Sequence, residues 1–195
     1  MSAALATGAV ALTPMFETAV LADGRSCESL VALKLPDTTI SRAGVVAAGA
    51  FVPPAIPQGR GGRGGNPFAT LPSFCRVVAS VKPTSDSDIQ IEVWLPVANW
   101  NGRFQAAGGA AGGNSAVAGG INFPALASSV RAGYATAGTD NGHQGATLAF
   151  ASDHPQRLID FGYRATHEMT VKAKAIVKAF YESGPSHSYW NACAA

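Results

Sequence analysis

The sequence has 195 residues, of which 47% are hydrophobic and 13% are charged, and its formal net charge is +2. This length allows one domain with a hydrophobic core, and 22 glycines indicate a compact α/β or β-rich fold with tight turns rather than a coiled coil. The nearly neutral charge supplies no dense basic stripe, so the composition argues against a nucleic-acid partner.

Residues 1–26 are considered apart from the rest, and the first 21 of them are apolar and rich in small side chains. A secretory signal begins with a basic region, but the first arginine here is Arg25. Pro14 and Glu17 interrupt the apolar run, which makes it too short and broken to span a membrane. Two interpretations stay open: a signal peptide whose basic start is missing, or a poorly ordered tail.

Residues 27–52 are expected to form an N-terminal arm with short β elements, among them the strand-like run TTISRAGVV. Residues 58–66, QGRGGRGGN, predict a solvated flexible loop, because two arginines do not make a phosphate site. From Phe74 onward, FCRVVASVKP and IQIEVWLPV alternate apolar and polar residues around the turn SDSD. This period is typical of half-buried strands and predicts an antiparallel hairpin.

The second half alternates strands and helices. A short buried strand is predicted at residues 104–107, a helix after Pro124, and a strand at YATAGTD. A long helix is expected at about residues 156–183, because apolar side chains recur at steps of three and four. Its predicted buried stripe consists of Ile159, Tyr163, Thr166, Met169, Ala173, Ile176 and Phe180. The final run SYWNAC predicts a buried strand that enters a sharp turn.

This alternation predicts an α/β fold with a parallel sheet, right-handed crossovers and helices on both faces. Chemistry in such sheets gathers at the carboxyl ends of the strands. Three such ends are expected here, at residues 107–113, 139–145 and 193–195.

The last of these ends has the composition of a nucleophile elbow. A strand, a sharp turn and a helix present the nucleophile, and the turn needs small neighbours. Residues 191–195, NACAA, supply the small residues but no hydroxyl. The glycine-rich run AAGGAAGGN after the earlier strand suits an oxyanion-hole loop, where the lack of a Cβ leaves room for a substrate oxygen. A plain tight turn is the alternative.

The run TDNGHQG places Asp140 and His143 close together. A triad with Ser115 is disfavoured, because Ser115 does not lie in G-x-S-x-G and does not follow a long strand. A metal site at the same pair lacks a third ligand. We therefore expect these side chains to brace the loop or to contact substrate.

The chain has three cysteines, Cys27, Cys75 and Cys193. In an oxidising compartment two would pair and one would remain. Cys27 and Cys75 are the natural candidates, since both lie in the N-terminal region.

The motifs CESLVALKLPDTTISRAGVVAAGAF, WLPVANWNGRFQAAGG, GYATAGTDNGHQG, DFGYRATHEMTVKAKAIV and SYWNAC occur in the order found in one family. From about Cys27 to the end, the sequence resembles the tannase and feruloyl esterase family. The resemblance implies an α/β-hydrolase core with a mixed sheet and flanking helices. Residues 27–195 would be its N-terminal portion, truncated at the nucleophile elbow, with the lid and later catalytic residues absent.

The resemblance also implies site residues. Cys193 matches the family's elbow cysteine, whose disulfide partner would lie further along the chain, and Ala194 stands where the family has its nucleophilic serine. The N–H of Ala195 would be one oxyanion donor, and the loop at Gly108 and Gly109 would supply the other. Cys27 and Cys75 resemble the N-terminal disulfide of relatives.

The implied function is that of a secreted or periplasmic carboxylic ester hydrolase acting on small aromatic esters of the feruloyl or galloyl type. Because Ala194 replaces the serine, this chain is expected to be inactive as it stands; a non-catalytic hydrolase-like binding module is the alternative. No cofactor is expected in these residues, and the family's structural calcium would belong to the lid. A sheet that stops at this point should leave its last strand with an exposed edge and promote aggregation or a partly molten state.

Overall fold

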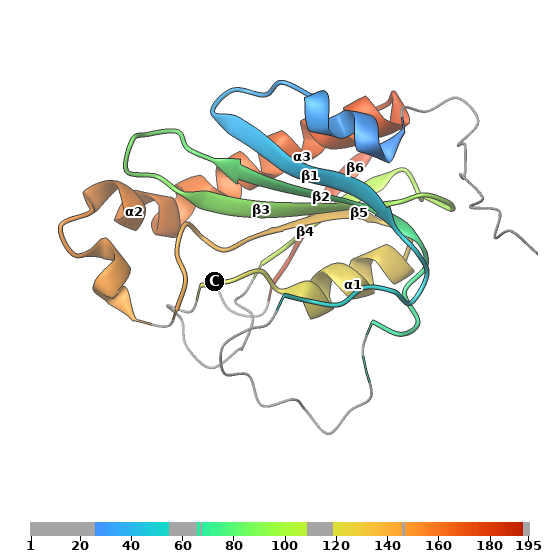
Figure 1. Cartoon of the computed structure of the whole chain (residues 1–195), viewed down its shortest axis with the longest axis horizontal. Helices are drawn as coiled ribbons and strands as arrows, with labels where there is room; N and C mark the ends of the chain where they lie inside the picture. The colour runs from blue at the N-terminus through green and yellow to red at the C-terminus, as the bar shows by residue number, and fades with distance from the viewer. Residues whose placement is uncertain (1–25, 55–65, 67, 109–118, 146, 193–195) are drawn as a thin grey trace, which may run out of the picture.

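The computed structural model describes residues 26–54, 66, 68–108, 119–145 and 147–192. Within these residues, one six-stranded sheet lies between α1 on one side and α3 with η1 on the other (Figure 1). The elements in chain order are η1 Cys27–Ala32, β1 Thr38–Val46, β2 Phe74–Val81, β3 Ile89–Pro96, β4 Arg103–Ala107, α1 Phe123–Arg131, β5 Ala135–Thr139, η2 Leu148–Ala151, α2 Pro155–Ile159, η3 Asp160–Arg164, α3 Ala165–Tyr181 and β6 His187–Asn191.

The sheet is mixed, with the strand order β1-β2-β3-β5-β4-β6. Strands β1, β2 and β3 pair antiparallel, and β3 pairs antiparallel with β5. Strand β4 lies parallel to both β5 and β6. The predicted α/β class and the predicted β2–β3 hairpin are therefore confirmed.

The chain reverses its direction across the sheet at β4. From β4 it passes through α1 to β5 on one side, and from β5 it passes through α3 to β6 on the other side of β4. Right-handed crossovers in opposite directions place their helices on opposite faces, which is the arrangement in Figure 1. The β4–β6 boundary is thus a topological switch point, where open α/β sheets bind ligands beyond the carboxyl ends of the strands.

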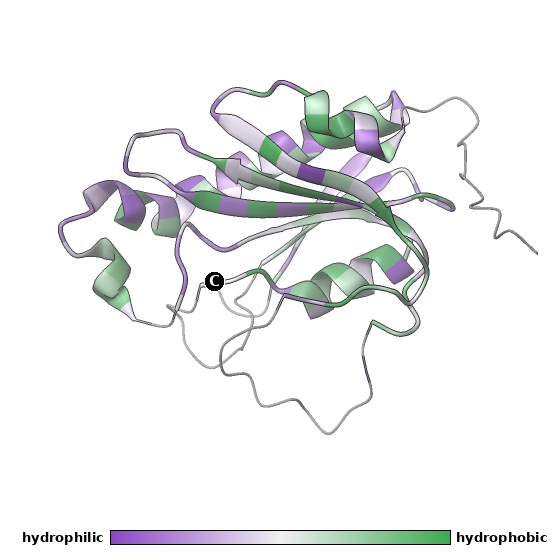
Figure 2. Ribbon diagram, in the orientation of Figure 1, coloured by the Kyte–Doolittle hydropathy of each residue, from purple (hydrophilic) through white to green (hydrophobic). Residues whose placement is uncertain are grey.

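Each face of the sheet packs against its own apolar layer. Under α3 and η1, the strands contribute Val77, Val93 and Phe104, which pack with Met169 and Ile176. Under α1, a second cluster is half aromatic and consists of Phe51, Phe68, Leu71, Phe74, Trp94, Ala107, Phe123, Leu126, Ala127 and Val130. Figure 2 shows hydrophobic residues alternating with hydrophilic ones along the strands, as expected for a sheet that buries side chains on its faces.

The predicted long helix is interrupted near its start. α2 and α3 are separated by η3, a π-helical turn, in which hydrogen bonds span one more residue than in an α-helix. The extra residue shifts the angular positions of the side chains that follow it around the helix axis. Asp160 is therefore fully buried and Tyr163 is 65% exposed. The predicted stripe is wrong at Tyr163 and correct from Met169 to Phe180, where Ala173 and Ile176 are also buried.

Two further expectations need correction. The predicted strand TTISRAGVV is confirmed as β1, but the N-terminal arm is not made of β elements alone, since it begins with the 3₁₀ helix η1. Strand β6 is not buried: all five of its residues are exposed, and the strand is the last in the order of the described sheet.

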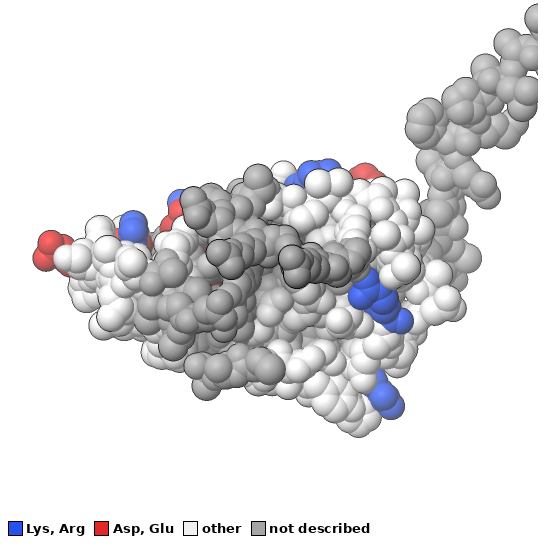
Figure 3. Space-filling model, turned by 90° about the horizontal axis from the view of Figure 1, so that it is seen from below, with Lys and Arg blue, Asp and Glu red and all other residues white. Residues whose placement is uncertain are grey.

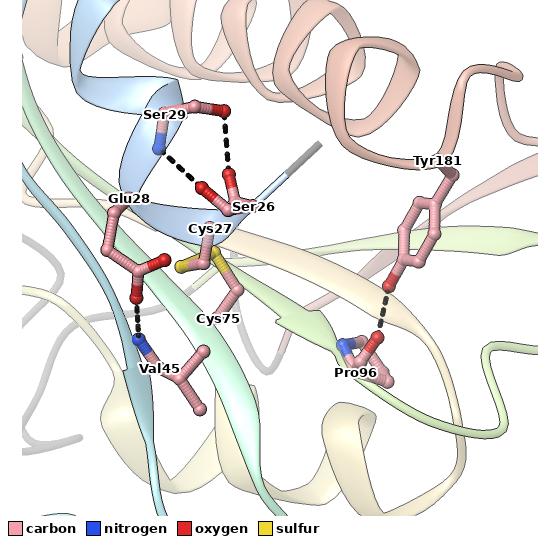
Figure 4. Close-up of a disulfide and its surroundings, with 8 residues drawn as sticks. All are labelled: Ser26, Cys27, Glu28, Ser29, Val45, Cys75, Pro96 and Tyr181. Carbon is pink, nitrogen blue, oxygen red and sulfur yellow. Dashed lines mark hydrogen bonds between the residues drawn. A yellow bond between two sulfur atoms is a disulfide. The ribbon is translucent and has the colours of Figure 1, made fainter. Parts of the chain in front are cut away.

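A disulfide joins Cys27 of η1 to Cys75 of β2, as predicted (Figure 4). Both cysteines are buried, and Ser26 caps η1 by accepting a hydrogen bond from the Ser29 N–H at 3.3 Å. At the end of α3, the hydroxyl of Tyr181 donates to the carbonyl oxygen of Pro96 at 2.7 Å. These contacts attach η1 and α3 to the same face of the sheet.

We expect removal of the Cys27–Cys75 disulfide to destabilise the fold. The cysteines are 48 positions apart. In the chain-entropy model, a loop of that size contributes about 3–4 kcal/mol. Urea unfolding of the Cys27→Ala/Cys75→Ala variant should show a loss of that order, and dithiothreitol should destabilise the parent chain but not the variant. Equal effects of dithiothreitol on both proteins would contradict this.

Candidate active site

The carboxyl ends of β4 and β6 lie side by side at the switch point. The two strands are in register from Arg103↔His187 to Ala107↔Asn191. One residue further, the N–H of Gly108 donates to the carbonyl oxygen of Asn191 at 2.9 Å, which extends the ladder beyond the strands. The predicted glycine loop and the predicted elbow therefore begin next to each other.

Gly108 is a glycine for a reason that the sequence did not reveal. A Cβ at this position would overlap the Trp190 ring and would lie 2.9 Å from the Cβ of Ala192. Real Cβ atoms essentially never approach other atoms that closely. The missing side chain thus lets the ends of β4 and β6 pack closely, in addition to any room it leaves for substrate.

Of the residues predicted to form the oxyanion hole, only Gly108 lies among the described residues. The Gly108 N–H is already used, since it donates to Asn191. Gly109, Cys193, Ala194 and Ala195 lie outside the described residues. The structure brings together the last described residues before each of them, Gly108 and Ala192.

Asp140 follows β5 directly and organises the loop at that strand end. Its side chain is 2% exposed. Oδ1 accepts hydrogen bonds from the N–H groups of Gln90 and Gly142 at 3.0 and 2.8 Å, and Oδ2 accepts from Nε2 of Gln144 at 2.9 Å. One carboxylate therefore joins the start of β3 to the loop after β5.

Burial raises the pKa of Asp140 from 3.8 to about 6. The hydrogen bonds from Gln90, Gly142 and Gln144 and the nearby His143 act in the opposite direction and offset part of the rise. Carboxyl groups with a pKa this close to neutral are concentrated at functional sites, although structural networks contain them too.

His143 lies on the same loop, in an aromatic environment. Its ring stacks on Phe150 with centroids 3.9 Å apart, and its edge contact with Phe161 spans 5.4 Å. Close to it, the N–H of Gly119 donates to the carbonyl oxygen of Gly145 at 2.7 Å, and a Cβ on Gly119 would overlap the backbone of His143. The loop after β5 thus contacts the chain at Gly119, the first described residue after β4 and Gly108.

These contacts agree with the interpretation that Asp140 and His143 brace the loop. Ser115 lies outside the described residues, so the structure does not test the disfavoured triad. Across the described ranges, no three His, Cys, Asp or Glu side chains form a group able to hold a metal ion. In the same ranges, no helix is both long and apolar enough to cross a bilayer.

Sequence reasoning missed a second buried carboxylate near this loop. Asp160 is fully buried, and its Oδ1 accepts a hydrogen bond from Nε of Arg164 at 2.5 Å. Nη2 of Arg164 also donates to Oγ of Ser87 at 3.1 Å, and the Cβ of Asp160 closely faces Gly142. The signal in the sequence was an Asp-Arg pair four residues apart within the predicted helix.

Charged side chains do not concentrate on the face seen in Figure 3. Among the described residues on that view, Lys, Arg, Asp and Glu atoms occur as separate small groups. The described residues on this face therefore form no extended patch of one charge.

The mixed sheet, the opposed crossovers and the paired strand ends define an α/β-hydrolase-like fold. A solved structure, feruloyl esterase B from Aspergillus oryzae, matches 86% of this chain with a TM-score of 0.73 and 31% sequence identity. The family model described as "Tannase and feruloyl esterase" matches residues 75–195. The chain belongs to the tannase and feruloyl esterase family.

Two curated relatives agree with this assignment. An uncharacterized esterase of Xanthomonas campestris is 41% identical over 167 residues, which is 85% of this chain and 27% of the relative. A probable feruloyl esterase B-1 of Aspergillus fumigatus is 35% identical over 133 residues, or 68% of this chain and 24% of the relative. The chain thus spans about a quarter of the length of these proteins, and 31% of the solved Aspergillus oryzae chain.

We expect Gly108→Ala to destabilise the chain by about 1–3 kcal/mol, because the new methyl group forces Trp190 and Ala192 away. Truncation of the ring should relieve this, so the Gly108→Ala/Trp190→Ala variant should lose less than the sum of the single changes. Denaturant unfolding measures both effects. Gly44→Ala, in open space on β1, is the matched control and should stabilise the chain by about 0.5–1 kcal/mol, the gain expected for alanine over glycine in a strand. Additive losses at Gly108 and Trp190 would refute the contact.

Asp140→Asn should remove a pH dependence of stability. The folded-state pKa is about 6 and the reference value is 3.8, so folding favours the protonated carboxyl. The contribution of the protonated Asp140 carboxyl to the free energy of unfolding is fully present below pH 3.8. It is lost as the pH rises through 6, and the total loss is about 3 kcal/mol. Urea unfolding at pH values from 4 to 7 should show the parent chain losing stability relative to the variant. A constant difference across that range would contradict the raised pKa.

Proposed function

We propose that this chain provides the nucleophile-elbow part of a carboxylic ester hydrolase acting on phenolic acid esters of the feruloyl or galloyl type. The observation that supports the proposal is the closely packed β4–β6 switch point, where Gly108 lies next to Asn191 and Ala192, the last described residues before the predicted elbow. Membership in the tannase and feruloyl esterase family supports the reaction class.

In this proposal the ester carbonyl lies above the carboxyl ends of β4 and β6. A serine hydroxyl at the position of Ala194 attacks the carbonyl carbon, and a histidine base takes the hydroxyl proton and returns it to the leaving alcohol. Water then releases the acid from the acyl-enzyme. The carbonyl oxygen, negative in the tetrahedral intermediate, accepts hydrogen bonds from the N–H groups of Ala195 and Gly109, because the Gly108 N–H is engaged with Asn191.

The alanine at position 194 makes this chain inactive by itself in our proposal, since loss of a triad nucleophile removes most of the rate enhancement. The same residue favours a second candidate, a hydrolase-like module that binds an aromatic ester without turnover. The Cys27–Cys75 disulfide supports a secreted or periplasmic location for either function, because disulfides persist mainly in oxidising compartments.

A pair of chimeras tests the proposal. Residues 27–195 replace the matched part of the Xanthomonas campestris esterase, once unchanged and once with Ala194→Ser. We expect the Ala194→Ser chimera to hydrolyse methyl ferulate and the unchanged chimera to be at least about 10³-fold slower. Far-ultraviolet circular dichroism and a melting curve check that both chimeras fold.

The outcomes separate the two functions. A folded Ala194→Ser chimera with no hydrolysis of phenolic esters would overturn the enzymatic proposal. Saturable binding of methyl ferulate by the unchanged chimera, measured by calorimetry and with no gain in hydrolysis from Ala194→Ser, would support the binding module instead.

A further inference from the structure

The loop after β5 is connected to the candidate site through Gly119. Strands β5 and β4 are parallel neighbours, so their carboxyl ends meet at the same end of the sheet. The N–H of Gly119 donates to the carbonyl oxygen of Gly145 at 2.7 Å, and Gly119 is the first described residue after Gly108. The run that begins at Gly108 and includes the proposed donor Gly109 is therefore attached to this loop at its far end.

Gly142 is the residue at which this loop packs against the helical segment. Its φ is +77°, and a Cβ at this position would lie 2.9 Å from the Cβ of Asp160. Glycine alone combines that backbone conformation with so close an approach. The N–H of Gly142 also donates to Oδ1 of Asp140 at 2.8 Å, so Gly142 contacts two buried aspartates at once.

The position of Asp160 is itself fixed by hydrogen bonds. Asp160 begins the π-helical turn η3, and its Oδ1 accepts from Nε of Arg164 at 2.5 Å. Arg164 also donates to Oγ of Ser87 at 3.1 Å, and to the side-chain and backbone carbonyl oxygens of Gln156, each at 3.0 Å. These bonds tie the π-helical turn to the turn before β3. Single π-helical turns of this kind occur frequently at functional sites.

Stability alone explains this arrangement poorly. A buried ion pair contributes little net stability compared with apolar side chains of similar size. Among the described residues, Oδ2 of the fully buried Asp160 has no hydrogen-bond partner, which adds a cost. A role in fixing one arrangement of the neighbouring loop accounts for the carboxylate better.

We propose that the contact between Asp160 and Gly142 is a positioning contact for the ester hydrolysis proposed above, on which this inference rests. The contact fixes the loop after β5 and, through Gly119, the far end of the glycine-rich run. Both residues act through the loop and not on the substrate. A displaced oxyanion donor loses an interaction that is made mainly in the transition state, so the contact affects kcat rather than KM.

A matched pair of glycine variants in the Ala194→Ser chimera tests the inference. Gly142→Ala places a methyl group against Asp160 and should lower kcat for methyl ferulate about tenfold or more, with KM changed less than about threefold. Gly102→Ala is the control, because its φ is +74° and the nearest atom to the new methyl group is Oγ of Ser186 at 3.9 Å. The control should have the same backbone strain and keep kcat within about twofold.

Two substitutions at Asp160 test its hydrogen bond to Arg164. Asp160→Asn keeps an oxygen that can accept this bond and should hold kcat within about threefold of the parent chimera. Asp160→Ala removes the acceptor and should lower kcat about tenfold. Melting curves show which variants are folded.

Hydrogen exchange on the 195-residue chain follows the contact without any turnover. Gly142→Ala should accelerate exchange of the Gly119 amide, and by about tenfold or more beyond any change at the Val93 amide in the middle of β3, which reports global unfolding. Asp160→Ala should act in the same direction, so the measurement remains decisive if Gly142→Ala prevents folding.

The possible failures are distinguishable. Equal kcat in the Gly142→Ala and Gly102→Ala chimeras, a loss that lies in KM instead of kcat, or a Gly119 amide that exchanges as in the parent chain would overturn this inference alone. A folded Ala194→Ser chimera without turnover would overturn the proposed function, and this inference with it.

Discussion

The close contact between the carboxyl ends of β4 and β6 is the constraint on which the rest of the site depends. Gly108 donates its N–H to Asn191 and leaves no Cβ between itself and Trp190 or Ala192. The crossovers on either side of β4 place α1 and α3 on opposite faces of the sheet. A crevice for a ligand is therefore expected beyond the carboxyl ends of β4 and β6. A catalytic group after Ala192 and a donor after Gly108 would therefore start from neighbouring positions on a rigid sheet.

A layer of buried polar groups supports the neighbouring strand end. Asp140 collects hydrogen bonds from β3 and from its own loop, while Asp160 and Arg164 connect the π-helical turn to the loop before β3. Gly142 lies between these carboxylates: it donates its N–H to Asp140 and packs against the Cβ of Asp160. The buried carboxylate of Asp140, with its three hydrogen-bond partners, fixes one arrangement of its surroundings, because any displacement leaves a polar group without its partners. A loop held in this way suits a catalytic site, where small displacements of the reacting groups lower the rate.

Much of the fold could be predicted from local pattern. The alternation in β2 and β3, the helix after Pro124 and the order of later elements all follow from short-range periodicity, and the disulfide follows from the positions of Cys27 and Cys75. The π-helical turn could not be predicted this way, because apolar spacing across it still reads as an α-helix until Asp160 is seen buried and Tyr163 exposed. The exposure of β6 accompanies its place as the last strand of the described sheet, and the need for glycine at position 108 depends on Trp190, which lies 82 residues away in sequence. Both are tertiary facts without a local signature.

The disulfide has a consequence for how the chain withstands proteolysis. Cys27 and Cys75 enclose β1 and the glycine- and arginine-rich run, and β1 also pairs with β2 along its whole length. A single peptide-bond cut between the two cysteines therefore yields two polypeptides that remain covalently joined and still hydrogen-bonded in the same sheet. Such a nicked molecule keeps its mass apart from one added water, and only a reducing agent reveals that its backbone has been severed.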